Sequence, residues 1–71
     1  MVNRRLRTGL LPSFDERRRL RESVGLSQAA LAAAIGVSPS AIHTWETKRD
    51  PKGLPRVAYV KALRDMAKRD N

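Results

Sequence analysis

The sequence predicts an all-α fold, in which a basic arm precedes a compact domain of four helices. Ser13, Ser27 and Ser38 each stand where a helix is expected to begin, because a serine hydroxyl can accept a hydrogen bond from an unpaired amide of the first turn. Gly25 and Gly36 follow the first two of these segments, and glycine commonly ends a helix because it adopts positive φ at little cost. A chain of 71 residues has room for one small domain.

The amino-terminal part of the chain divides into an arm and a first helix. Residues 1–12 show no sustained hydrophobic period and are expected to form a flexible arm, which leaves residues 13–71 as the domain. The arm's positive charge comes from Arg4, Arg5 and Arg7. Ser13 and Glu16 have the spacing of a capping box, so the first helix is predicted over residues 14–24.

Two short helices joined by a tight turn are predicted in the middle of the chain. The second helix should cover residues 28–35, and Ala32 should lie where the two helices cross, because its single methyl permits a close backbone approach. Gly36 supplies the turn. Pro39 follows a serine and suits the first helical turn, where its missing N–H does no harm, so the third helix is predicted over residues 39–47.

The last helix is predicted over residues 55–68, after a loop at residues 50–53. Helical spacing predicts that its core-facing residues are Val57, Val60, Leu63 and Ala67, with Tyr59 and Met66 at the margin. In the first helix, Arg17 falls on the apolar side of the helical wheel. Its stem is expected to pack there while its charged head reaches out to solvent.

The charge distribution predicts a polyanionic partner. The net charge is +8 and the pI is about 11.4. Residues 1–21 and 48–71 each contribute +5, whereas residues 22–47 contain no lysine or arginine and contribute −2. A nearly neutral segment between two basic ones suits a protein that holds phosphates from its flanks while a neutral helix enters a groove. Nucleic acid is therefore the expected partner, although a solvated surface role fits Arg64, Lys68 and Arg69 equally well.

Composition disfavours several other classes of function. Without cysteine, neither a disulfide framework nor a thiolate metal site can form. The one histidine, His43, cannot by itself build a metal site or a triad, and the carboxylates show no pairing typical of acid and base chemistry. The longest apolar run, residues 29–35, is too short to span a bilayer. We therefore expect a cytosolic protein that is no enzyme and has no cofactor, metal, small-molecule ligand or membrane contact.

The middle of the chain resembles the helix-turn-helix of the phage repressor and Cro-like family, also called Xre-type or lambda repressor-like. The matching residues are Arg21, Gly25-Leu26-Ser27-Gln28, Leu31-Ala32, Gly36-Val37-Ser38, Ile42 and Trp45-Glu46. The resemblance implies a four-helix domain, with a fifth helix left open, and double-stranded DNA as the partner. It departs at Lys48, where the family commonly has glycine, and in a short loop before Leu54-Pro55.

The resemblance also implies roles for individual residues, with the third helix in the major groove. Its base-reading residues would be Ser38, Pro39, Ser40, His43 and Thr44. The phosphate contacts would come from Gln28, Thr47, Lys48, Arg49 and Lys52, and the arm arginines would reach a neighbouring minor groove or phosphates. The structural residues would be Arg21 and Glu46 as a salt bridge, Ala32 and Gly36 at the turn, and Ile42 and Trp45 in the core.

The function implied is a transcriptional regulator of the small phage or bacterial repressor kind, which occupies an operator in the bacterial cytosol or nucleoid. An architectural or excision factor and an antitoxin-like protein-interaction module are the alternatives. Because the chain ends soon after the fourth helix, the protein is expected to be either a monomer or a homodimer that forms only on DNA.

Overall fold

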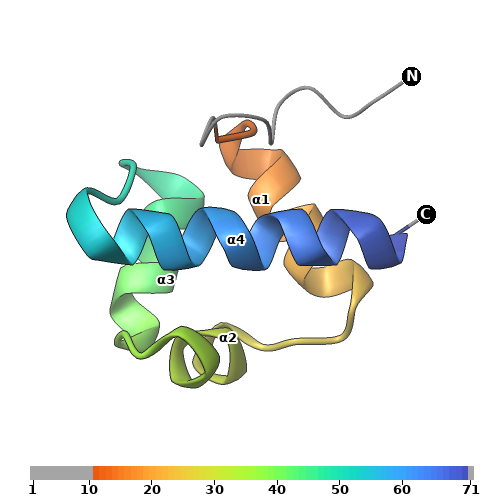
Figure 1. Cartoon of the computed structure of the whole chain (residues 1–71), viewed down its shortest axis with the longest axis horizontal. Coiled ribbons are helices and arrows are strands. Elements are labelled where there is room, and N and C mark those ends of the chain that lie inside the picture. Colours follow the sequence, from red (N-terminus) through yellow and green to blue (C-terminus); the bar gives the residue numbers. More distant parts are fainter. Residues whose placement is uncertain (1–10, 71) are drawn as a thin grey trace.

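Residues 11–70 are described by the structure, a computed structural model. Within this range the chain forms four helices and no strand (Figure 1). Their bounds are α1 Phe14–Ser23, α2 Gln28–Ile35, α3 Pro39–Thr47 and α4 Gly53–Asp70. The predicted all-α fold with four helices is confirmed. The predicted arm residues Arg4, Arg5 and Arg7 lie outside the described residues.

Each of the first three helices begins at the serine that the sequence indicated. The hydroxyl oxygens of Ser13, Ser27 and Ser38 accept hydrogen bonds from backbone amides three residues later, at 3.2, 3.0 and 3.2 Å. Each serine thus satisfies one of the amides that have no partner inside the helix. Helix α2 ends at Gly36, whose φ of 79° lies in the left-handed region. Helix α4 begins two residues before the predicted start.

The core is built around α4, and its composition corrects two predictions. Tyr59 and Met66, expected at the margin, are buried, whereas Val57, expected in the core, is 66% exposed. The physical reason is the direction of the buried face of α4. Tyr59, Leu63 and Met66 follow one another at i, i+4 and i+7 and define that face, and Val57 lies well over 90° away from its centre.

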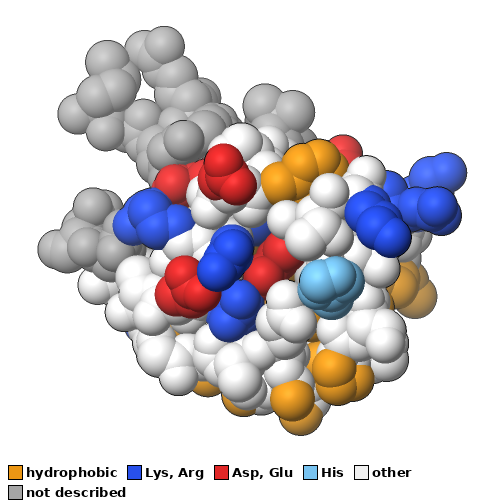
Figure 2. Space-filling view, turned by 180° about the vertical axis from the view of Figure 1, so that it is seen from behind, with side chains coloured by type: hydrophobic (Ala, Val, Ile, Leu, Met, Phe, Trp, Pro, Cys, Tyr) orange, Lys and Arg blue, Asp and Glu red, His pale blue; other side chains and the backbone are white. Residues whose placement is uncertain are grey.

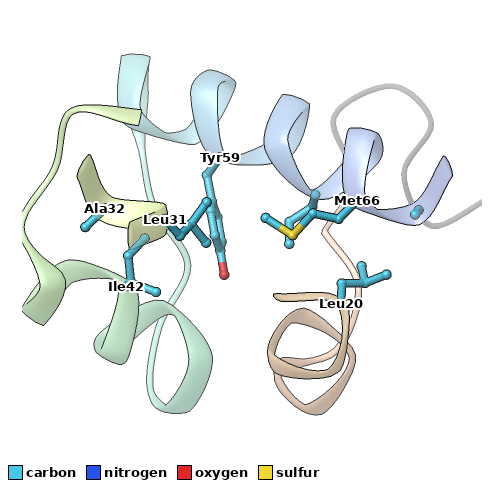
Figure 3. Packing of buried hydrophobic residues seen from close by; sticks show 8 residues of the cluster. Leu20, Leu31, Ala32, Ile42, Tyr59 and Met66 are labelled. Carbon is cyan, nitrogen blue, oxygen red and sulfur yellow. The ribbon is translucent and has the colours of Figure 1, made fainter. Parts of the chain in front are cut away.

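The helices enclose a single cluster of buried side chains. Helix α4 packs against α1 and α2, and α3 packs against α1 and α2 (Figure 1). Figure 3 shows Tyr59 descending from α4 between Leu31 and Ile42 on one side and Leu20 on the other. Its ring centroid lies 5.0 Å from that of Trp45, at an interplanar angle of 47°. This aromatic pair connects α4 to the carboxyl-terminal half of α3.

The Tyr59 hydroxyl is buried and has no hydrogen-bond partner within residues 11–70. Burial raises the pKa of Tyr59 above its ordinary value, and the nearby Glu46 carboxylate adds to the shift. The folded state therefore holds this proton more tightly than the unfolded chain does. The free energy of unfolding therefore keeps its full value below about pH 10, the ordinary tyrosine pKa, and falls as the pH rises further.

We expect Tyr59→Phe to raise the free energy of unfolding at neutral pH by about 1 kcal/mol, because it removes a buried hydroxyl without a partner. Between pH 9 and pH 11 the variant should also lose less stability than the wild type. Urea unfolding at the three pH values measures both effects. A variant less stable than the wild type at pH 7 would mean that the hydroxyl is hydrogen-bonded in solution.

Candidate nucleic-acid interface

Helix α3 is held against α2 by a tight turn. The backbone amide of Val37 donates to the Ala32 carbonyl at 2.9 Å, and Gly36 donates to the same carbonyl. Ala32 and Ile42 are buried where the helices meet, with 1% and 0% of each residue exposed. This packing fixes the orientation of α3 and determines which of its side chains face outward.

The outward side of α3 carries four of the residues predicted to contact DNA. Ser40, His43 and Thr47 are exposed and Thr44 is half-buried. Their spacing of i, i+3, i+4 and i+7 places them on one stripe of the helix, which we call the recognition stripe. Ser38 and Pro39 are exposed at the amino-terminal end of α3. The structure thus places three of the predicted base-reading residues on the recognition stripe and the other two at the amino-terminal end of the same helix.

Two hydroxyl groups, one at the N-cap of α3 and one on the stripe itself, already make hydrogen bonds within the protein. The Ser38 oxygen accepts the amide hydrogen of Ala41, and the Thr47 hydroxyl donates to the His43 carbonyl at 2.8 Å. A phosphate oxygen can only accept hydrogen bonds, so Thr47 would have to turn its hydroxyl away from His43 to contact one. Ser38 keeps its hydroxyl hydrogen as a donor.

The loop after α3 contains three exposed basic residues, Lys48, Arg49 and Lys52. Their side chains make no hydrogen bond or ion pair with any other part of residues 11–70. The backbone beneath them is ordered, because the amides of Lys48 and Arg49 both donate to the Thr44 carbonyl, at 2.8 and 3.1 Å. We call residues 48–52 the basic loop. In Figure 2, blue side chains gather at the right-hand edge of the molecule, on the side where this loop lies.

Behind the recognition stripe, a buried ion pair joins α1 to α3. Arg21 Nε and Nη2 donate to the two carboxylate oxygens of Glu46 at 2.6 and 3.0 Å, and both side chains are at least nine-tenths buried. Arg21 Nη1 also donates to the Leu26 carbonyl at 2.8 Å. The hydrogen bonds to Glu46 raise the pKa of Arg21, and burial opposes this shift. The negative charges of Glu46 and Glu22 raise the pKa further.

Gln28, predicted to contact a phosphate, extends this ion pair. Its Nε2 donates to Glu46 Oε1 at 3.2 Å, and the side chain is half-buried at the start of α2. An amide nitrogen carries two hydrogens, so one donor of Gln28 remains for a phosphate while the other is held by Glu46. Nothing in the sequence indicated that Gln28 bonds to Glu46 as well as being available to a phosphate.

Arg17 does not reach out to solvent as expected. Only 4% of the residue is exposed, and its guanidinium donates to the carbonyls of Pro12 and Trp45 and to the Asp50 carboxylate. The reason is that tertiary packing brings two backbone carbonyls and a carboxylate to the apolar side of α1, so the charge is satisfied without leaving the interior. Leu11 and Pro12, the last residues of the predicted arm, also pack on the domain.

A hollow of about 680 Å³ lies between α1 and α3, beside His43 and Thr47. Figure 2 shows positive and negative side chains intermingled next to the histidine. Much of this lining is already paired: Arg18 Nε lies 3.2 Å from Glu22 Oε2, and Arg21 binds Glu46. Among residues 11–70, no three histidine, cysteine or acidic side chains come together in a way that could hold a metal ion.

The fold and this surface define a helix-turn-helix protein. The family described as "Helix-turn-helix domain" matches residues 18–69, which include most of α1 and all of α2 and α3. The chain belongs to this DNA-binding family. No curated protein and no solved structure matches the chain significantly. Within the described part of the chain, no helix is both long enough and apolar enough to cross a membrane.

Proposed function

We propose that this protein is a sequence-specific, double-stranded DNA-binding transcriptional regulator of the repressor or Cro-like kind. The observation that carries the proposal is the uncharged recognition stripe of α3 next to the exposed cations of the basic loop. The stripe would lie against base edges in the major groove, and the basic loop would bind the phosphates beside that groove. By occupying an operator, the protein would exclude polymerase, so its function is binding rather than catalysis.

The recognition stripe supports moderate sequence discrimination. Serine, threonine and histidine each offer single hydrogen bonds or contacts to thymine methyl groups, whereas the strongest base contacts are bidentate and come from arginine, asparagine or glutamine. Direct readout is therefore expected to be supplemented by the shape of the DNA and by the predicted arm. The arm residues Arg4, Arg5 and Arg7 suit a narrow minor groove, where the negative potential is strongest.

We propose that the free protein is a monomer and that two copies meet only on adjacent half-sites. Leu54 and Val57 are large apolar side chains that α4 exposes, with 84% and 66% of each residue accessible. Two such side chains cover far less than the roughly 800 Å² per partner of a stable interface. The proposed site of action is the bacterial cytosol or nucleoid, where operator DNA lies.

Base reading and phosphate binding can be separated by mutation. If Ser40 and Thr44 face base edges, Ser40→Ala and Thr44→Ala should each lower the discrimination between a preferred and a scrambled duplex by about 1 kcal/mol. Lys48→Ala, Arg49→Ala and Lys52→Ala should instead weaken binding to both duplexes. Each lost phosphate contact should reduce the slope of log affinity against log salt by about one, from a wild-type slope of about −4 or steeper.

The preferred duplex is first selected from a random DNA pool, and competition binding at several salt concentrations then measures both quantities. A nearly flat salt dependence of the wild type would exclude nucleic acid as the main partner. If the serine and threonine variants lose affinity equally for both duplexes, α3 does not read sequence. The protein would then be better described as an architectural DNA-binding factor than as a sequence-specific regulator.

A further inference from the structure

Arg17 connects the segment before α1 to two neighbouring stretches that lie about 30 residues further along the chain. Its Nε donates to the Pro12 carbonyl at 2.9 Å, its Nη1 to the Trp45 carbonyl at 2.9 Å, and its Nη2 to Asp50 Oδ1 at 2.6 Å. The Phe14 ring lies 4.5 Å from the guanidinium carbon, which adds a cation–π contact. One buried side chain therefore joins the segment that precedes α1, the end of α3 and the basic loop.

The contact with Trp45 stabilises the end of the recognition helix. The carbonyl of Trp45 is among the last four of α3, which have no amide partner inside the helix. A guanidinium at this position supplies a donor and places a positive charge at the negative end of the helix dipole. The contact thus holds the last turn of α3, from which the basic loop departs.

The contact with Asp50 holds the basic loop itself. Asp50 is the one carboxylate among residues 48–52, and it lies between Arg49 and Lys52 in the sequence. Its side chain is 51% exposed, whereas that of Arg17 is 5% exposed, so the ion pair anchors a surface loop to the interior. The next residue, Pro51, is buried and anchors the same stretch of backbone.

We infer that Arg17 is a positioning residue for DNA binding: it fixes the basic loop against α1 and α3 and neutralises the loop's carboxylate. Lys48, Arg49 and Lys52 can then bind phosphates, because the Asp50 carboxylate, neutralised by Arg17, no longer repels those phosphates. This inference rests on the proposed function. It assigns to Arg17 a role beyond stabilising the core, because its bonds end on the segment that would contact DNA.

Two variants of Asp50 test the anchor at constant charge. Asp50→Asn and Asp50→Ala remove the same negative charge, but only asparagine keeps an oxygen that can accept the Arg17 hydrogen bond. We expect Asp50→Asn to bind a scrambled duplex at least as tightly as the wild type. Asp50→Ala should bind about five-fold more weakly than Asp50→Asn, because its loop is released. Equal affinities of the two variants would overturn the inference.

Two variants of α1 provide a readout that needs no DNA. Arg17→Met removes the anchor, and Arg19→Met makes the same charge change at a half-exposed residue paired with Glu16. The amides of Lys48 and Arg49 should exchange hydrogen at least about ten-fold faster in Arg17→Met, because the bonds that order the loop are lost. Exchange at these amides should be unchanged in Arg19→Met. Equal exchange in both variants would contradict the inference.

The double variant Arg17→Met with Asp50→Asn separates positioning from charge, because its net charge equals that of the wild type. We expect Arg17→Met alone to bind a scrambled duplex more weakly than the wild type. If the double variant binds as weakly as Arg17→Met, the positioning role is supported. Wild-type affinity of the double variant would mean that Arg17 acts only by neutralising Asp50, which would overturn the inference. If Arg17→Met fails to give a cooperative melt, the comparison of Asp50→Asn with Asp50→Ala still tests the inference, because the Asp50 side chain is half-exposed and its replacement leaves the core intact. Wild-type protein that binds no duplex while loop exchange still depends on Arg17 would reject the proposed function and leave the loop anchor standing.

Discussion

Replacing Glu46 with alanine is expected to lower the free energy of unfolding by about 3 to 5 kcal/mol, a large part of the stability of so small a domain. The Glu46 side chain is 1% exposed and accepts two hydrogen bonds from Arg21 and one from Gln28. Its removal leaves the Arg21 guanidinium charged and largely buried, because an arginine side chain does not lose its proton near neutral pH. Urea unfolding followed by circular dichroism measures the loss.

Glu22→Ala is the matched control for this change. It removes the same charge from a carboxylate that also lies near Arg21, at 4.0 Å, but the Glu22 side chain is 54% exposed. Exposed ion pairs contribute little, so we expect this variant to lose less than about 1 kcal/mol. If Glu46→Ala were no less stable than Glu22→Ala, the buried ion pair would not be what joins α1 to α3.

Replacing Ala32 with glutamate is expected to abolish cooperative folding. Ala32 is 1% exposed at the crossing of α2 and α3, where the added side chain has no room and its carboxylate would be buried without a partner. The variant should show no cooperative thermal transition by circular dichroism. It should also bind no DNA, because α3 would have no fixed orientation.

The neighbouring substitution Ala33→Glu provides the control, since it makes the same change one residue later on the same helix. Ala33 is exposed, so this variant should fold with stability close to that of the wild type. A folded, DNA-binding Ala32→Glu protein would contradict the close helix crossing that the structure shows. The pair therefore distinguishes a packing effect from a general effect of a new negative charge on α2.

The helix starts and the turn could be predicted from the sequence because they depend on short-range interactions. Ser13, Ser27 and Ser38 each bond an amide three residues away, and Gly36 needs only its own freedom to adopt positive φ. Such contacts form within one turn of chain and leave a clear local pattern. The burial of Ala32 and Ile42 followed from the same pattern, because the turn places two helices side by side.

The sequence also indicated where charge is concentrated and which residues stand on the outer side of α3, because net charge and helical spacing are properties of the chain itself. It could not show which polar groups meet across the fold. Arg17 lies 28 residues from Trp45 and 33 from Asp50, and Gln28 lies 18 from Glu46. Whether such a side chain reaches solvent, a phosphate or an interior acceptor depends on the packing of the helices.

The local sequence pattern likewise could not predict which face of α4 is buried. The helix carries apolar residues on more than one side, and its contacts with α1 and α2 select Tyr59 and Met66 for burial while leaving Val57 exposed. The same packing turns Arg17 toward the end of α3 and the basic loop. Backbone caps and turns form from neighbouring residues, whereas the partners of buried polar groups are set only when distant helices pack, because an unpaired charge in the interior costs too much free energy.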